Sequence, residues 1–310
     1  MRVLVTGGAG YLGSVLCEHL LDAEHHVTVL DNMRYGEPSL HHLCHHPEFE
    51  VVRGDVRDEA TMRDLLTNAD AILPLAAIVG AKPCDEDPQQ ATTVNLDAIK
   101  MLNRLRSADQ LVVFPVTNSG YGTKSGETHC TEDTPLEPIS LYGRTKVDAE
   151  AELLSKGASI TLRLATVFGM SPRMRLDLLV NHFTYTAVTD GYIVIFEKDF
   201  KRNFIHVRDV ADAFLHALDN ADAMAGKSYN AGLDEANLSK EELALAVQEQ
   251  VSDFFIHFSE IGSDPDKRNY IVSNQRLREA GFEAKRSVQS GIAELIKGYR
   301  LMPRGRFKND

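Results

Sequence analysis

The amino-acid sequence predicts an α/β fold, with a doubly wound parallel sheet followed by a smaller α/β lobe. Short apolar runs suited to buried parallel strands alternate with helical patterns from the first residues to about residue 169. The first run ends in a glycine-rich turn that leads directly into a helical pattern. After residue 169 the alternation stops, and short strands mix with amphipathic helices. These three observations together predict the fold class.

Six apolar runs are predicted to form the strands of the sheet. They cover residues 2–6, 27–31, 50–56, 71–77, 111–116 and 159–165. Helical spacing of apolar residues follows the glycine turn through Leu20 and recurs over residues 88–106 and 140–154. Pro74 is unusual in a central strand, because proline has no N–H to donate to a neighbouring strand. The connection at residues 78–88 is long, and it lies where a substrate can bind.

The turn at residues 7–13 has the spacing of a dinucleotide-binding loop. Gly7, Gly10 and Gly13 satisfy GxxGxxG, and the same turn also contains GxGxxG. Glycines let the backbone approach a pyrophosphate at the N-terminus of a helix. Asp31 ends the next strand, where its carboxylate can accept from a ribose 2′-hydroxyl and would repel a 2′-phosphate. The pattern therefore predicts NAD, and the nearby Arg34 leaves NADP as the alternative.

Residues at other strand ends are candidates for further contacts with the cofactor. Asp55 can accept from the adenine amino group or, alternatively, cap the helix that follows. Ala76 and Ala77 are small enough for backbone to approach the cofactor, while Asn95 either hydrogen-bonds the turn that carries Thr117 or faces solvent. The predicted cofactor contacts are Gly7, Gly10, Tyr11, Leu12, Gly13, Asp31, Asn32, Asp55, Val56, Leu75, Ala76, Ala77, Asn95, Tyr142 and Lys146.

A tyrosine and a lysine four residues apart are the candidate proton-transfer pair. Tyr142 and Lys146 share one face of the predicted helix, so the ammonium can stabilise the phenolate. Such a tyrosine is suited to remove a proton from an alcohol. Thr117 ends the fifth strand, on the edge of an open α/β sheet where ligands bind. The three residues predict oxidation or reduction of an alcohol beside NAD.

Composition argues against several other classes of function. The formal net charge of −12 disfavours broad nucleic-acid binding. No apolar run approaches the roughly 18 residues of a membrane span, and we expect no signal peptide before the first strand. The histidines between residues 41 and 46 lack the spacing of a metal site, so no metal is predicted. A cytoplasmic protein with reduced thiols is expected, because no CxxC pair occurs among Cys17, Cys44, Cys84 and Cys130.

The second half of the chain is predicted to contribute a substrate-binding lobe that packs on the first domain with a cleft between them. Residues 1–169, with about 203–227, are assigned to the NAD-binding domain. Residues 170–202 and 228–310 are assigned to the lobe, which begins with a helical segment containing Asn181 and His182. A strand over residues 192–196 and a helix over about 208–220 follow.

Taken together, the motifs resemble the extended short-chain dehydrogenase/reductase family, which comprises the sugar-nucleotide epimerases and dehydratases. The resemblance covers nearly the whole chain. It rests on the glycine turn at 6–13, Asp31, Gly54-Asp55, Ala76-Ala77, Asn95, Thr117, Tyr121-Gly122, Tyr142-xxx-Lys146 and Arg202-xx-Ile205-His206-Val207. It implies a Rossmann fold, NAD as cofactor and a nucleotide sugar as substrate. It also implies a homodimer that packs the helices near 88–106 and 140–154.

The resemblance also assigns roles to individual residues. Tyr142 is implied as the base, Lys146 as its tuner and ribose anchor, and Thr117 as the partner of the sugar hydroxyl. Arginine forks suit phosphate oxygens, although a surface salt bridge is the alternative for each arginine. The predicted substrate contacts are Asn118, Ser119, Arg175, Asn181, Arg202 and Arg268.

Departures from the family pattern narrow the chemistry. Its dehydratases carry Asp-Glu directly after the threonine, where this chain has Asn118-Ser119. Elimination of water needs groups that take one proton and give another, which asparagine and serine do not readily do. The 3,5-epimerases carry a cysteine at the position of Ser119, so 3,5-epimerisation is disfavoured as well. His182 can serve as an acid at the sugar, but a structural or surface histidine is at least as good an interpretation.

Once elimination and 3,5-epimerisation are disfavoured, the chemistry that remains is oxidation or reduction at a single sugar carbon, for which C4 is the best candidate. The runs at 117–122 and 164–183 are most similar to the branch that modifies GDP-linked heptoses for bacterial capsules. That similarity implies oxidation of C4 of GDP-D-glycero-D-manno-heptose to the 4-keto form. A 4-epimerase or 4-ketoreductase is the alternative, and a 4,6-dehydratase or a non-catalytic NAD-binding protein ranks lower.

Overall fold

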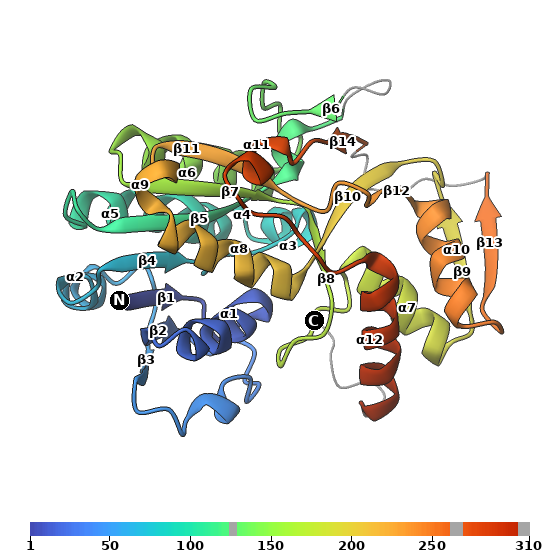
Figure 1. Cartoon of the computed structure of the whole chain (residues 1–310), viewed down its shortest axis with the longest axis horizontal. Helices are drawn as coiled ribbons and strands as arrows, with labels where there is room; N and C mark the ends of the chain where they lie inside the picture. The colour runs from blue at the N-terminus through green and yellow to red at the C-terminus, as the bar shows by residue number, and fades with distance from the viewer. Residues whose placement is uncertain (124–128, 261–268, 303–310) are drawn as a thin grey trace.

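A computed structural model describes residues 1–123, 129–260 and 269–302 of the chain, and a seven-stranded parallel sheet forms its centre (Figure 1). The strand order is β11-β7-β5-β4-β1-β2-β3. The strands are β1 (Arg2–Thr6), β2 (His26–Asp31), β3 (Phe49–Arg53), β4 (Ala71–Pro74), β5 (Leu111–Thr117), β7 (Ser159–Leu164) and β11 (Lys227–Ala231). The order reverses between β1 and β4, which is where open α/β sheets bind ligands. The expected doubly wound fold is confirmed.

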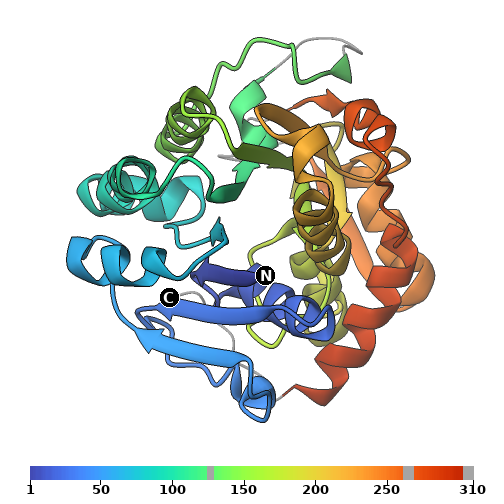
Figure 2. The ribbon, with the colours of Figure 1, turned by 60° about the vertical axis from the view of Figure 1, so that its left-hand side comes forward.

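Helices cover both faces of this sheet (Figure 2). Val3 and Val5 of β1 lie in one core with α1 (Tyr11–Asp22) and α8 (Val207–Asp219). Leu4 points to the opposite face and lies in a second core with α2 (Glu59–Thr67), α5 (Ala98–Leu105) and α6 (Leu141–Ser155). Burial on both faces explains why β1, β4 and β5 are largely apolar runs in the sequence.

Several boundaries differ from those expected. β4 ends at Pro74, three residues earlier than expected, and Pro74 is still paired with Thr6 of β1. The connection that follows contains a short helix, α3 (Ala81–Glu86). The helix expected over residues 88–106 consists of α4 (Pro88–Thr92), a π-helical turn (Thr93–Asp97) and α5.

The expected start of the lobe at residue 228 is wrong. It falls inside β11, whose residues pair in parallel with β7 in the large sheet. The histidine-rich segment forms only a short 3₁₀ helix (His41–Leu43). Within the described ranges, no group of three or more potential ligands is arranged to hold a metal ion.

The remaining elements form three small sheets and a group of helices beside the large sheet (Figure 1). β8 (Thr166–Phe168), β10 (Lys201–His206) and β12 (Asn237–Ser239) make one sheet. β9 (Tyr192–Phe196) pairs with β13 (Phe255–Ser259), and β6 (His129–Cys130) pairs with β14 (Ile271–Val272). The helices beside the small sheets are α7 (Leu179–Thr189), α10 (Lys240–Gln250) and α12 (Val288–Leu301), whereas α9 (Ala221–Met224) contacts α8 and α11 (Gln275–Glu279) contacts β11 of the large sheet. In the part of the chain described, no helix has the length and apolarity needed to cross a membrane.

Candidate active site

The glycine turn between β1 and α1 is packed so closely that side chains are excluded from it. Gly7 has φ +73°, and a Cβ added to it would lie 2.6 Å from the backbone nitrogen of Ala76. A Cβ on Gly13 would lie 2.4 Å from the carbonyl oxygen of Gly7. The first N–H groups of α1, including those of Tyr11 and Leu12, have no partner within the helix and point toward its N-terminus. The turn therefore has the form of a pyrophosphate cradle.

This cradle leads to our first prediction. Gly7→Ala should weaken NADH binding at least about tenfold, because the new methyl group displaces the backbone at Ala76. Gly191→Ala is the matched control, since Gly191 has φ +74° but no atom within 4 Å of an added Cβ. Fluorescence titration with NADH measures both affinities. Equal losses in the two variants would show that backbone strain, and not the close approach, limits binding.

Asp31 lies beside the glycine turn, as expected. Its Oδ2 accepts from the N–H of Ala9 at 3.0 Å, and its Oδ1 accepts from the N–H of Met33 at 2.8 Å. Each carboxylate oxygen has a further lone pair for a ribose hydroxyl. The guanidinium of Arg34 donates to Gln90 at 2.6 Å, so in this structure it is engaged away from Asp31. The arrangement favours NAD over NADP.

The residues after β3 and β4 border the same end of the sheet. Asp55 forms a salt bridge with Arg57 at 2.7 Å, and the hydrogen bonds from Arg57 lower the pKa of its carboxyl. The alternative role as a helix cap is wrong, because Asp58 caps α2. Val56 and Ala76 line a small apolar crevice with residues of β1, β4 and α5. Leu75 is held by the hydrogen bond from its N–H to the carbonyl of Thr6, at 2.9 Å.

Asn95 does not contact the turn carrying Thr117, nor does it face solvent. It is 2% exposed, and its amide oxygen accepts from the N–H of Ile78 while its nitrogen donates to the carbonyl of Ile78. The nitrogen also lies 3.5 Å from the hydroxyl of Thr145 in α6. Asn95 thus fixes the backbone that follows Ala77, and the π-helical turn around it places the side chain between β4 and α6.

The residues after β5 form a polar turn. The hydroxyl oxygens of Thr117 and Ser119 are 2.5 Å apart, and Thr117 also accepts from the N–H of Ser119 at 3.1 Å. Asn118 is 1% exposed, and neither atom of its side-chain amide has a hydrogen-bond partner among the described residues. A buried amide without partners is costly, and such groups are often completed by a ligand or water. Asn118 is therefore a candidate substrate contact.

Tyr142 and Lys146 lie on α6, whose N-terminus is capped by Ser140 accepting from the N–H of Gly143 at 3.1 Å. Tyr142 is half-buried, whereas Lys146 is 4% exposed with its Nζ 3.8 Å from the centroid of the Phe114 ring. Burial lowers the pKa of Lys146 to about 7, and the charge of Glu150 acts in the opposite direction. The pKa of the Lys146 ammonium thus lies close to neutral pH.

Glu150 was not predicted, although its spacing four residues after Lys146 is a signal that could have revealed it. It forms a buried salt bridge with Arg163 on β7 at 3.0 Å and accepts from Thr161 at 2.6 Å. Arg163 also donates to the hydroxyl of Tyr121 at 3.2 Å. These contacts fix the helix that carries the candidate base against the sheet.

The segment after β8 brings further predicted residues to the site. Arg175 forms a salt bridge with Asp177. Burial acts to lower the pKa of the Arg175 guanidinium, but the charges of Asp177, Tyr142 and Tyr11 raise this pKa overall. Arg175 therefore lies within electrostatic range of the candidate base. It is also a mostly buried cation, with its side chain 17% exposed.

Tyr11 and Asn181 use their side chains within the protein. The hydroxyl of Tyr11 donates to the carbonyl of Gly169 at 2.7 Å. Asn181 is fully buried, accepts from the N–H of Gly169 at 3.0 Å and donates to Tyr11 and to the carbonyl of Arg175. The side-chain amide of Asn181 thus holds this segment in place.

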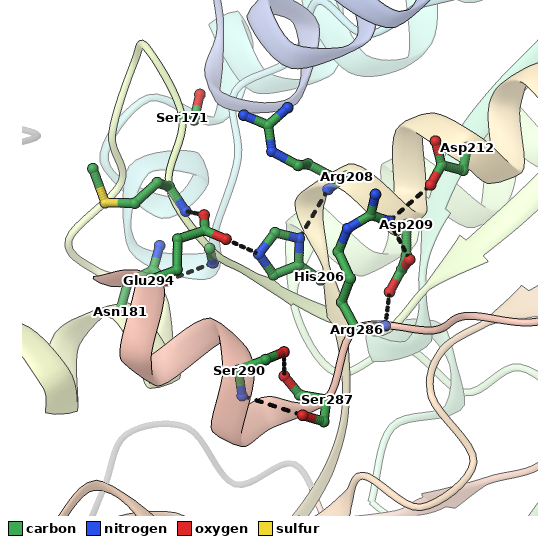
Figure 3. Close-up of polar contacts among 12 residues, drawn as sticks. Ser171, Asn181, His206, Arg208, Asp209, Asp212, Arg286, Ser287, Ser290 and Glu294 are labelled. Carbon is green, nitrogen blue, oxygen red and sulfur yellow. Dashed lines mark hydrogen bonds and ion pairs between the residues drawn. The ribbon is translucent and has the colours of Figure 1, made fainter. Parts of the chain in front are cut away.

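A second unpredicted contact fixes the same segment from the C-terminal helix (Figure 3). Glu294 of α12 accepts from the N–H of Met170 at 2.8 Å and lies 3.1 Å from Nε2 of His206. Nδ1 of His206 accepts from the N–H of Arg208, so its proton is assigned to Nε2. Burial acts against ionisation of Glu294, but the hydrogen bond with His206 lowers its pKa overall.

Two predicted substrate contacts remain, Arg202 and Arg268. Arg202 is 3% exposed, donates to the carbonyl of Lys201 at 2.9 Å and stacks 5.6 Å from the Tyr270 ring centroid. Arg268 lies outside the described residues. Arg202 is therefore a buried residue of β10 beside Tyr270, the residue that precedes β14.

Comparison with known proteins agrees with this arrangement. The model of the NAD dependent epimerase/dehydratase family matches residues 3–232. The low-salt glycan biosynthesis protein Agl12 of Haloferax volcanii is 30% identical over 96% of this chain and 98% of its own length. The UDP-glucose 4-epimerase of Mycolicibacterium smegmatis is 30% identical over 97% of this chain and 99% of its own. The structure of the Thermus thermophilus UDP-glucose 4-epimerase with NAD superposes with a TM-score of 0.84, at 25% identity over 97% and 99% of the two chains.

Proposed function

The chain belongs to the NAD dependent epimerase/dehydratase family and is an enzyme with NAD as its cofactor, and from this we propose that it oxidises C4 of a nucleotide-linked sugar. The substrate proposed is GDP-D-glycero-D-manno-heptose, which is converted to its 4-keto form. The enzyme would act in capsular polysaccharide biosynthesis in the cytoplasm. It is proposed to be a homodimer that packs α5 and α6 of the two subunits together.

The turn at Thr117, Asn118 and Ser119 is the observation that carries the proposal. It presents two hydroxyls and one buried amide, and it contains no carboxylic acid. These groups can bind and orient sugar hydroxyls, but they lack the acid and base that elimination of water requires. A single oxidation needs less, namely one base for the hydroxyl proton and an acceptor for the hydride. Tyr142 and the cofactor meet those two requirements.

Each residue of the proposed site has a separate role in the reaction. Thr117 positions the C4 hydroxyl, and its own hydroxyl is held by the short contact with Ser119. Tyr142 takes the hydroxyl proton as C–H cleavage begins, and Lys146 stabilises the resulting phenolate. Bound NAD would supply the acceptor for the hydride of C4. Asn118 completes the contacts to a neighbouring hydroxyl, while Arg175 and Arg202 face the charge of the diphosphate.

The nucleotide is the least constrained part of the proposal. Support for GDP comes from the run at residues 164–183, which resembles the branch of the family that modifies GDP-linked heptoses. The epimerases named above act on UDP-glucose according to their names. UDP-linked sugars are therefore the comparison substrates in the experiment that follows.

The enzyme should be incubated with NAD, GDP-D-glycero-D-manno-heptose and a 2-keto acid as a second electron acceptor. Trapping with borodeuteride should place deuterium at C4 of the recovered sugar, because a ketone accepts the label there. UDP-glucose and UDP-glucuronic acid provide the parallel reactions. Inertness toward every nucleotide sugar tried would contradict the proposal.

A 4-epimerase is the second candidate, favoured by the 30% identity to a UDP-glucose 4-epimerase over nearly the whole chain. Both reactions require Thr117, Tyr142 and Lys146. They differ in product, because an epimerase returns the hydride to the opposite face and releases an alcohol. Recovery of the C4-inverted sugar without a trapped ketone would select this candidate.

A further inference from the structure

Two loops from distant parts of the sequence meet beside the N-terminus of α1. One loop, residues 32–39, follows β2, and the other, residues 169–175, follows β8. The guanidinium carbon of Arg173 lies 3.8 Å from the centroid of the Tyr35 ring. Its Nε lies 3.9 Å from Oε2 of Glu37. Arg173 is 3% exposed, whereas Tyr35 is 52% exposed and covers the arginine from outside.

Both loops are fastened to the glycine turn, one on each side of Gly10. The hydroxyl of Ser39 donates to the carbonyl of Ala9 at 2.8 Å. The hydroxyl of Ser171 donates to the carbonyl of Tyr11 at 2.7 Å. The glycine turn, the two loops and the contact between them therefore form a closed ring of chain beside the start of α1.

This ring lies where a dinucleotide must pass. The N-terminus of α1 is the cradle for the pyrophosphate, and the loop of Tyr35 begins directly after Asp31, the expected ribose partner. The loop of Arg173 continues to Arg175, which is within electrostatic range of Tyr142 at the reacting end of the site. The joined loops thus connect the adenosine end of the cofactor site with the reacting end.

We propose that the contact of Arg173 with Tyr35 and Glu37 is a clasp that retains NAD and must open for the cofactor to enter or leave. The proposal rests on the NAD dependence of the family and not on which sugar is oxidised. Oε2 of Glu37 is buried and accepts no hydrogen bond within the described ranges, so its charge is compensated across the ion pair to Arg173. The clasp is held by side chains, without a hydrogen bond between the two backbones in the described residues.

Contacts of this kind can open without unfolding. Tyr35 is 52% exposed, and the ion pair between Arg173 and Glu37 spans 3.9 Å without a hydrogen bond to Oε2 of Glu37 in the described residues, so each contact is individually weak. Gly36, at φ +63° and with no atom within 4 Å of an added Cβ, turns the loop at a point free of packing. The clasp should therefore set the rate at which NAD dissociates, with little effect on the global fold.

The rate of NADH release tests the clasp directly. Wild-type and variant proteins loaded with NADH are mixed with excess NAD, and the fluorescence of NADH is followed; the chain has no tryptophan to interfere. Tyr35→Ala should release NADH about tenfold faster, because the aromatic face is lost. Tyr35→Phe keeps that face and should stay within about twofold of the wild-type rate.

Arg173→Ala should accelerate release to the same extent as Tyr35→Ala, and the double variant should be no faster than either. Because Arg173 is buried, thermal unfolding of each variant is measured in parallel, and the exposed Tyr35 keeps the test independent of folding. Unchanged release in Tyr35→Ala, or equal acceleration in Tyr35→Phe, would overturn the clasp. Failure of wild-type protein to bind NADH would instead contradict the cofactor, and no sugar is needed for either result.

Discussion

Tyr142→Phe is expected to lower kcat by about 10²–10⁴-fold while leaving NADH affinity nearly unchanged. The substitution removes the phenol oxygen that takes the hydroxyl proton, but it retains the ring that packs at the start of α6. The half-buried position of Tyr142 leaves room for this change without loss of core packing. Turnover of the nucleotide sugar, NADH titration and thermal unfolding measure the three quantities separately.

Tyr192→Phe is the control for the loss of a tyrosine hydroxyl, because Tyr192 is 61% exposed on β9 and distant in the sequence from α6. It should leave kcat, NADH affinity and stability unchanged. Normal turnover by Tyr142→Phe would show that another group is the base. Equal loss of turnover and of NADH affinity would show that the phenol acts in binding the cofactor and not in proton transfer.

The parts of the fold that were predictable are those in which local sequence and burial agree. The strands before the glycine turn and before Thr117 are apolar on both faces, which produces a continuous run that is easily recognised. β11 was missed because its sequence, Lys-Ser-Tyr-Asn-Ala, is largely polar. Asn230 in this strand is fully buried because it accepts from the hydroxyl of Tyr121 at 2.6 Å and its N–H donates to Glu132 at 2.7 Å.

In the candidate site, too, some residues could be predicted from the sequence and others could not. Tyr142, Lys146 and Thr117 could be predicted as site residues because their spacing and their place in the fold both carry information. Asn95 and Asn181 were assigned to the cofactor and the substrate, yet both side chains are bonded within the protein. A sequence does not distinguish an asparagine that binds a ligand from one that fixes a loop, since the partners of Asn181 include Tyr11, 170 positions away.

Lys146→Met is expected to make the protein more stable and less active at once. In the NAD-free protein, burial lowers the pKa of Lys146 to about 7, compared with about 10.4 for a solvated lysine. The unfolded chain therefore holds this proton more tightly than the folded chain between about pH 7 and pH 10. Below about pH 7, Lys146 is charged in both the folded and the unfolded state, and its burial lowers the free energy of unfolding by the full amount. As the pH rises toward 10, this destabilisation decreases.

Methionine removes the charge while filling a similar volume beside Phe114. The variant should gain about 2–4 kcal/mol in the free energy of unfolding at pH 6–7, and the gain should shrink toward pH 10. Its kcat should fall by at least about 10²-fold, because the phenolate of Tyr142 loses the charge that stabilises it. Denaturant unfolding across this pH range and steady-state kinetics measure the two effects.

Lys297→Met on the exposed side of α12 serves as the control and should change stability by less than about 0.5 kcal/mol at every pH. A gain for Lys146→Met that did not depend on pH would mean that better packing, and not removal of a buried charge, is responsible. A loss of stability at pH 6–7 would mean that the charge of Lys146 is compensated in the folded state, for instance by Glu150, more strongly than its burial indicates. In the expected case, the enzyme retains at α6 a lysine that destabilises the fold because catalysis requires its charge there.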